Sequence, residues 1–179
     1  MSIVKSSQAL ASRPNFPPYR LGDFTLELEN ESIAQPGLYI VPLRPLSGSE
    51  PAAVWKLCCR TNSGTLAGGV AIVVPLRGDS ASPRSLPHPV LGEWISALRY
   101  TGLNWMECGA VSVAPGFPEE GVMAALWEGL SRLMERNGVS FLIGTAPFAS
   151  LALDMSLSRG ARVLEPFASG NSRYFLFVK

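Results

Sequence analysis

Residues 105–147 read WMECGAVSVAPGFPEEGVMAALWEGLSRLMERNGVSFLIGTAP, and this stretch decides the fold. It begins with an apolar run that predicts a buried strand, and it ends with a second apolar run at 139–147. Between them, residues 119–137 predict a helix, because Pro118 stands near the first position and Gly138 follows the end. Two apolar strands joined by one helix indicate a β-α-β crossover, in which the strands run parallel.

The predicted helix is amphipathic. Seven apolar residues share one side of it: Val122, Met123, Leu126, Trp127, Leu130, Leu133 and Met134. Four charged residues occupy the other side: Glu128, Arg132, Glu135 and Arg136. One face of the helix is therefore expected to be buried against a sheet.

Further strands are predicted on both sides of this unit. The alternation of FTLELEN at 24–30 indicates a strand, and AVWKLCCRT and LAGGVAIVVPL, joined by the turn NSG, indicate a hairpin. GLYIVPLRPL at 37–46 has the prolines of an edge strand. After the crossover, FASLALDMSLSRG predicts a second helix, and ARVLEPF and SRYFLFVK predict a final strand pair.

The remaining segments are rich in serine, proline and glycine. Residues 1–20 predict a flexible arm that precedes a single domain over 21–179. RGDSASPRSLPHP at 77–89 predicts a long loop, followed by a short helix or irregular segment at 90–102. Within this region, residues 82–98 either cover an apolar tunnel as a lid or cap the core.

Composition excludes several classes of function. Fifteen basic and fourteen acidic side chains leave a net charge of +1, which gives no field to attract nucleic acid or anionic lipid. No run of about 18 apolar residues occurs, so we expect no transmembrane segment and a cytoplasmic location. Three cysteines, an odd count, favour reduced thiols. A single histidine, His88, argues against a zinc site or a histidine-based triad, and no metal is expected.

The order strand, VAPGFPEEGVMAALW, helix, GVSFLIGTAP resembles the acyl-CoA-binding core of the GNAT superfamily of N-acyltransferases, over residues 55–179. ECGAVSVAPGF and ALWEGLSRLMERNGVSFLIGTAPF are most similar to the branch that transfers long acyl chains. That branch includes N-acyl amino acid synthases, ornithine-lipid acyltransferases and acyl-homoserine lactone synthases. The resemblance implies an α+β (mixed α/β) fold: a twisted, mostly antiparallel sheet with a parallel β-α-β core and helices on both faces.

The resemblance also implies a donor site. The pantetheine arm of acyl-CoA or an acyl-carrier protein would lie between GAVSV and SFLIG, as an added strand. Its main-chain partners are then Val111, Ser112 and Val113. Its phosphates would rest at the helix N-terminus, on the main chain of Glu119, Glu120, Gly121, Val122 and Met123. The acyl group would pass to a small-molecule amine.

Two side chains are implied to act in catalysis. Glu107 matches a functional glutamate of the long-acyl branch, and a carboxylate or water relay is needed to deprotonate the attacking amine. Backbone amides near Val111 would polarise the thioester carbonyl. Ser156 stands where the superfamily often has a tyrosine general acid, and it would at most position water. The alternative for Glu107 is a strand-end carboxylate paired with an arginine.

The donor motif departs from the superfamily, which leaves a second function open. Pro118 replaces a usual Arg or Gln, and Met123 replaces a second small residue. Glu119 and Glu120 either repel a pyrophosphate, which disfavours free coenzyme A more than a carrier protein, or simply complement the helix dipole. The alternative function is therefore a non-catalytic domain with this fold that acts as a binding or regulatory module.

Overall fold

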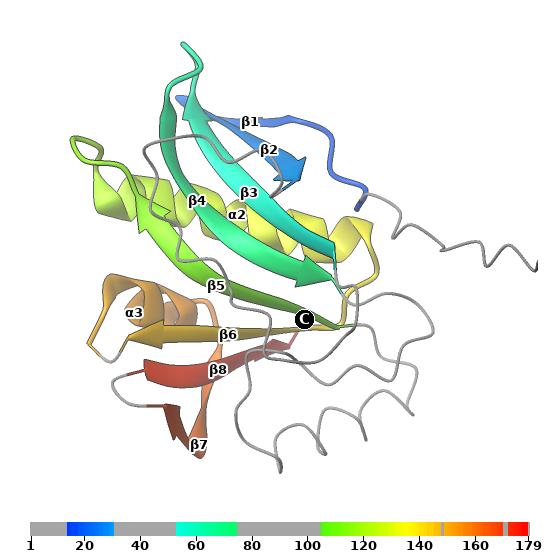
Figure 1. The fold of residues 1–179 in the computed structure, drawn as a ribbon, viewed down its shortest axis with the longest axis vertical. Coiled ribbons are helices and arrows are strands. Elements are labelled where there is room, and N and C mark those ends of the chain that lie inside the picture. Colours follow the sequence, from blue (N-terminus) through cyan, green and yellow to red (C-terminus); the bar gives the residue numbers. More distant parts are fainter. Residues whose placement is uncertain (1–13, 31–52, 75–104, 148, 170–171, 179) are drawn as a thin grey trace, which may run out of the picture.

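The computed structural model describes residues 14–30, 53–74, 105–147, 149–169 and 172–178. These ranges hold one sheet of eight strands and two helices (Figure 1). Their bounds are β1 (Tyr19–Leu21), β2 (Phe24–Asn30), β3 (Ala53–Thr61), β4 (Leu66–Val74), β5 (Trp105–Val113), α2 (Glu119–Arg136), β6 (Phe141–Pro147), α3 (Leu151–Ser158), β7 (Arg162–Ser169) and β8 (Ser172–Val178).

The strand order is β1-β2-β3-β4-β5-β6-β8-β7. β5 and β6 run parallel, and every other neighbouring pair of described strands is antiparallel. The predicted α+β sheet with a parallel β-α-β core is therefore confirmed. The segments predicted at 37–46 and 77–102 lie outside the described residues, so the edge strand, the long loop and the lid stay predictions.

Residues 15–21 contact the core and the sheet. Phe16 is buried at 4% exposure, and the main-chain amide of Asn15 donates to the side-chain oxygen of Asn137 at 2.8 Å. Tyr19–Leu21 adds β1 to the sheet beside β2. The predicted flexible arm over 1–20 and the domain over 21–179 stay predictions, and the first thirteen residues lie outside the described part of the chain.

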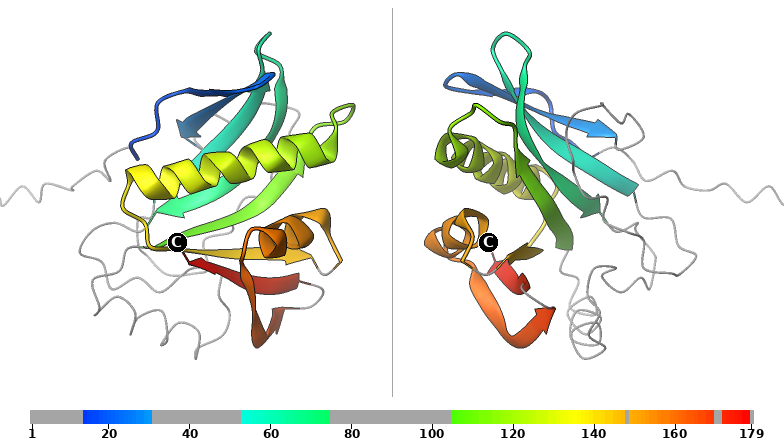
Figure 2. Two further views of the ribbon diagram at one scale, coloured as in Figure 1. Left: turned by 180° about the vertical axis from the view of Figure 1, so that it is seen from behind. Right: turned by 60° about the vertical axis from the view of Figure 1, so that its left-hand side comes forward.

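Both described helices lie on the same face of the sheet. α2 crosses β2, β3, β4 and β5, α3 packs on β6, β7 and β8, and the two helices contact each other (Figure 2). The expectation of helices on both faces is thus met on one face only within the described ranges. Neither described helix has the length and hydrophobicity needed to cross a bilayer.

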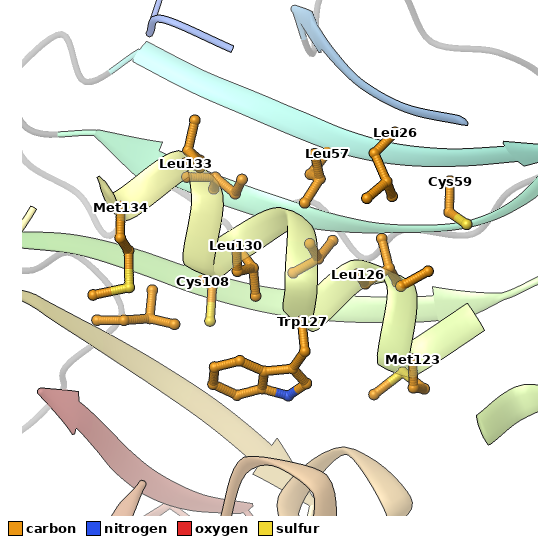
Figure 3. Packing of buried hydrophobic residues seen from close by; sticks show 14 of the residues in the cluster. Leu26, Leu57, Cys59, Cys108, Met123, Leu126, Trp127, Leu130, Leu133 and Met134 are labelled. Atoms are coloured by element: carbon orange, nitrogen blue, oxygen red, sulfur yellow. The ribbon is translucent and has the colours of Figure 1, made fainter. Parts of the chain in front are cut away.

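The core fills the layer between this face and the helices. All seven apolar residues predicted for the inner side of α2 are buried, and Figure 3 shows this side of the helix facing Leu26 of β2, Leu57 of β3 and Cys108 of β5. Trp127 reaches beyond them and meets Phe177 of β8 edge to face at 5.5 Å between ring centroids. α2 lies close to β3, since a Cβ on Gly129 would come within 2.8 Å of Leu57 Cδ2. The predicted amphipathic face is confirmed.

Candidate functional site

The parallel pairing of β5 with β6 is short. It runs from Trp105 opposite Phe141 to Cys108 opposite Gly144, and then stops. Beyond this point β5 continues to Val113, and Figure 1 shows it diverging from β6. The main chain of residues 109–113 therefore has no ladder with β6 in the described structure, and this edge of β5 can receive an extended ligand.

A β-bulge lies at the start of the diverging segment. On β4, Gly69 pairs with Ser112 and Ala71 pairs with Gly109, so one residue of β4 faces two residues of β5, at 110 and 111. Such an extra residue bends its strand and increases the local twist. The bulge thus gives a physical reason for β5 to leave β6 here, although β5 keeps its pairing with β4.

The loop after β5 leads directly to the start of α2. Gly116 takes a positive φ of 88°, and Pro118 is the N-cap residue, with no side-chain cap bond. The first helical bond runs from the Val122 amide to the Pro118 carbonyl at 3.1 Å. The first-turn amides of Glu119, Glu120 and Gly121 precede that bond and have no carbonyl within the helix to accept from them.

Three of the five residues predicted for the phosphate site precede the first helical hydrogen bond. Glu119 and Glu120 are exposed, as is Gly121. In contrast, the Val122 and Met123 side chains belong to the core, and the Val122 amide is already bonded. The expectation named the main chain of these five residues, and their contact with the donor phosphates stays a prediction.

Glu107 is buried near the end of the paired part of β5, one residue before Cys108, where the pairing with β6 stops. It lies at 1% exposure between Met106 and Cys108, both of which pack in the core on the helix side. Because successive side chains of a strand alternate, Glu107 points to the face opposite the helices. Burial, and then the charge of Glu107, raises the pKa of the Cys108 thiol.

Ser156 is held inside α3. Its side chain is 1% exposed, and its hydroxyl donates to the Ala152 carbonyl at 2.6 Å. The hydroxyl proton that a general acid would supply is already donated to a main-chain carbonyl of α3. The geometry is that of a structural serine, and we give Ser156 no part in the chemistry below.

A charged cluster occupies the face opposite the helices and was not predicted. Arg60 of β3 donates through Nε to Glu27 and through Nη2 to Glu29 at 2.5 Å, both on β2. Burial raises the Glu29 pKa, but the hydrogen bond and charge of Arg60 outweigh it, so this pKa lies below its ordinary value. Alternating charge on two paired strands was the available signal.

Cys58 lies beside this cluster. Burial, and then the charge of Glu29, raises the pKa of its thiol to about 12. Burial raises the pKa of the Cys59 thiol, which lies on the helix side, to about 11. Within the described residues no group of three His, Cys, Asp or Glu side chains converges as a metal site would require.

A hollow of about 430 Å³ lies over the outer side of α2. Its lining comes from the β1–β2 turn, the first half of α2 and the residue after α3: Leu21, Gly22, Asp23, Phe24, Gly121, Ala124, Ala125, Glu128 and Arg159. It shares only Gly121 with the predicted site residues. It is therefore not the space between the diverging strands.

Comparisons with known proteins agree on the architecture. No protein-family model matches the sequence, and no curated protein matches it. Among solved structures, FeeM, an N-acyl amino acid synthase from uncultured soil microbes, matches 72% of this chain and 74% of its own at 13% identity, with a TM-score of 0.50. The chain has the GNAT fold.

Two further GNAT structures match less well. The PaiA N-acetyltransferase of Thermoplasma acidophilum, in complex with coenzyme A, gives a TM-score of 0.48 at 11% identity. The GNAT domain of S. lividans PAT gives 0.46 at 14% identity. Each match covers 70% of this chain and 61% of the other, so the chain spans less than two thirds of those proteins. The likeness to FeeM confirms the resemblance stated from the sequence at the level of the fold.

Proposed function

We propose that the chain is an N-acyltransferase that moves an acyl group from a phosphopantetheine thioester to an amine. The observation that carries the proposal is the divergence of β5 from β6 after Cys108, beside the uncapped start of α2. This arrangement offers an open strand edge for the amides of the pantetheine arm and free helix amides for its phosphate. A likeness in fold to FeeM is consistent with this proposal.

Glu107 is the proposed base. An amine arrives protonated, so the buried carboxylate of Glu107 takes a proton from it, directly or through one water. The free amine nitrogen then attacks the thioester carbon, and a C–N bond forms as the carbonyl oxygen becomes an oxyanion. Main-chain amides of the open segment near Val111 would stabilise that oxyanion. Collapse breaks the C–S bond, and the surplus proton of the attacking nitrogen passes through water to the leaving thiolate, which gives the neutral amide and the free thiol.

The donor is proposed to be an acyl-carrier protein or acyl-CoA, with the carrier favoured. Glu119 and Glu120 place two exposed carboxylates at the helix start. They oppose the several phosphate charges of coenzyme A more than the single phosphodiester of a carrier. Glu119→Gln combined with Glu120→Gln should therefore lower KM for an acyl-CoA donor, with a smaller gain at high salt. The amine acceptor and a cytoplasmic location remain predictions.

The direct test uses a panel of acyl-CoA, acyl-carrier-protein and amine substrates, with thiol release as the readout. Glu107→Gln keeps the shape of the side chain and removes its basicity, so kcat/KM should fall by roughly 10² to 10⁴ while Tm stays near that of the native protein. Glu135→Gln, an exposed change in the last turns of α2, is the matched control. Thiol release from no donor, or full activity of Glu107→Gln, would overturn the proposal.

A non-catalytic binding module is the second candidate, and one observation favours it. Ser156 cannot replace the usual general acid, because its proton is bonded within α3. If this function is correct, native protein releases no thiol, and Glu107→Gln changes stability at most. The same substrate panel therefore separates the two functions.

A further inference from the structure

Ser112 carries a buried hydroxyl that the proposed chemistry does not use. Its Oγ is shielded from water and has no hydrogen-bond partner in the described structure. A hydroxyl in that position costs free energy unless a partner arrives, because it has lost its bonds to water. Such a group deserves an explanation, and a bound ligand is one.

The direction of this side chain follows from the register. Val111 and Val113 pack against the core on the helix side, so Ser112 between them points to the opposite face, as Glu107 does. Its neighbour across β4 is Gly69, which has no side chain to offer. The next residue along that row, Cys58, is already hydrogen-bonded to Glu29. On its other side, β6 no longer pairs with β5.

The position of Ser112 along β5 determines which part of a bound pantetheine arm its hydroxyl can contact. Ser112 lies four residues beyond Cys108, the last residue paired with β6. At about 3.3 Å per residue, shortened by the bulge, this separation is roughly 10 to 13 Å. In an extended pantetheine thioester, the second amide and the neighbouring hydroxyl lie roughly 9 to 11 Å from the sulfur, at about 1.25 Å of reach per bond.

We propose that the Ser112 hydroxyl hydrogen-bonds to the far amide and hydroxyl end of the donor's pantetheine arm. This inference rests on the proposed function, which places the thioester sulfur where β5 leaves β6. Ser112 is then a specificity-determining residue that favours donors with the complete arm over donors truncated after the first amide. The contact belongs to the side chain, whereas the main chain of the same segment binds any extended ligand.

The test compares two acyl thioesters that differ only in the length of the arm. Binding of decanoyl-pantetheine and of decanoyl-N-acetylcysteamine is measured by calorimetry on native protein, Ser112→Ala, Ser112→Thr and the control Ser131→Ala. The loss of one hydrogen bond predicts a Kd for decanoyl-pantetheine about 5- to 30-fold higher in Ser112→Ala. The Kd for the truncated thioester should stay within about twofold, and Ser112→Thr should restore much of the lost affinity.

The unliganded Tm provides the second readout. Removing an unpartnered buried hydroxyl should leave Tm of Ser112→Ala equal to or above that of the native protein. A lower Tm with unchanged Kd values would show a structural role and overturn the inference. Equal effects on both thioesters would overturn it as well, while leaving the proposed function intact. If native protein binds neither thioester, the inference falls together with the proposed function.

Discussion

Gly68→Ala is the most informative single change for the architecture of the site. Gly68 lies in β4, where β4, β5 and the start of α2 come together. A Cβ at this position would lie 2.6 Å from Val122 Cγ1 and 2.7 Å from the Ser112 carbonyl oxygen. Ordinary contact begins at 3.4 Å, so the helix start and β5 would each have to move by about 0.7 to 0.8 Å.

The expected cost follows from which atoms can yield. Extra volume in a packed core typically costs about 1 to 3 kcal/mol. The Ser112 oxygen is part of the main chain and cannot rotate away, so we place Gly68→Ala at about 2 to 3 kcal/mol. For a chain of 179 residues, this corresponds to a fall in Tm of about 4 to 12 °C.

Two other glycines supply matched controls. A Cβ at Gly129 meets the far ends of Leu57 and Leu26 at 2.8 and 3.2 Å, and these side chains can shift. With the gain in helix propensity, Gly129→Ala should cost at most about 1 kcal/mol. A Cβ at Gly121 meets Pro118 at 3.6 Å, an ordinary contact, so Gly121→Ala should leave Tm unchanged or higher.

Thermal unfolding and urea unfolding of the three variants provide the assay. We expect stability in the order Gly121→Ala, then Gly129→Ala, then Gly68→Ala as the least stable. If Gly68→Ala unfolds at the same temperature as Gly121→Ala, then β4, β5 and α2 are not as close as described, and the geometry assigned to the open strand edge is incorrect.

Three further predictions concern the thiols, the charged cluster and the N-terminal segment. Thiol reagents at pH 8 should leave the native protein unmodified and react only after denaturation, since burial raises the pKa of all three thiols: Cys58, Cys59 and Cys108. Glu29 has a lowered pKa in the folded state, so its charge stabilises the fold above the unfolded-state pKa of about 4.3, and this stabilisation is lost as pH falls below that value. The free energy of unfolding of Glu29→Gln, measured in urea, should therefore depend less on pH in that range. Phe16→Ala should lower the free energy of unfolding by about 3 to 5 kcal/mol if Phe16 packs as described, whereas no change in urea midpoint would mean that it does not.

Local patterns predicted most of the described fold. β5, α2 and β6 follow one another in the sequence. The helix begins after Pro118 and ends before Gly138, and both residues determine the local backbone conformation by themselves. β1 was missed because its three residues follow two prolines and are too few to show alternation. Gly22, with φ of 57°, turns the chain into β2, and this glycine before Asp23 was the available signal.

The site was predicted less completely, because the bulge changes which face a residue occupies. Strict alternation from Cys108 would place Ser112 on the helix side, and the extra residue at 110–111 moves it to the other face. No pattern in GAVSV marks that bulge. Similarly, the resemblance pointed to Ser156, and no sequence motif shows that its hydroxyl donates to the Ala152 carbonyl one turn earlier in α3.

The four-residue ladder between β5 and β6 also has a mechanical consequence. Among the described strands, this short ladder is the only backbone pairing between the strands β1–β5 and the strands β6–β8. The two halves of the sheet are otherwise held together by the packing of α2 and α3. Separation along this ladder breaks few hydrogen bonds and should occur well before global unfolding. An extended ligand that pairs with β5 beyond this ladder would add main-chain hydrogen bonds between the two halves. Hydrogen exchange of the amides at residues 109–113 should therefore slow when the ligand binds.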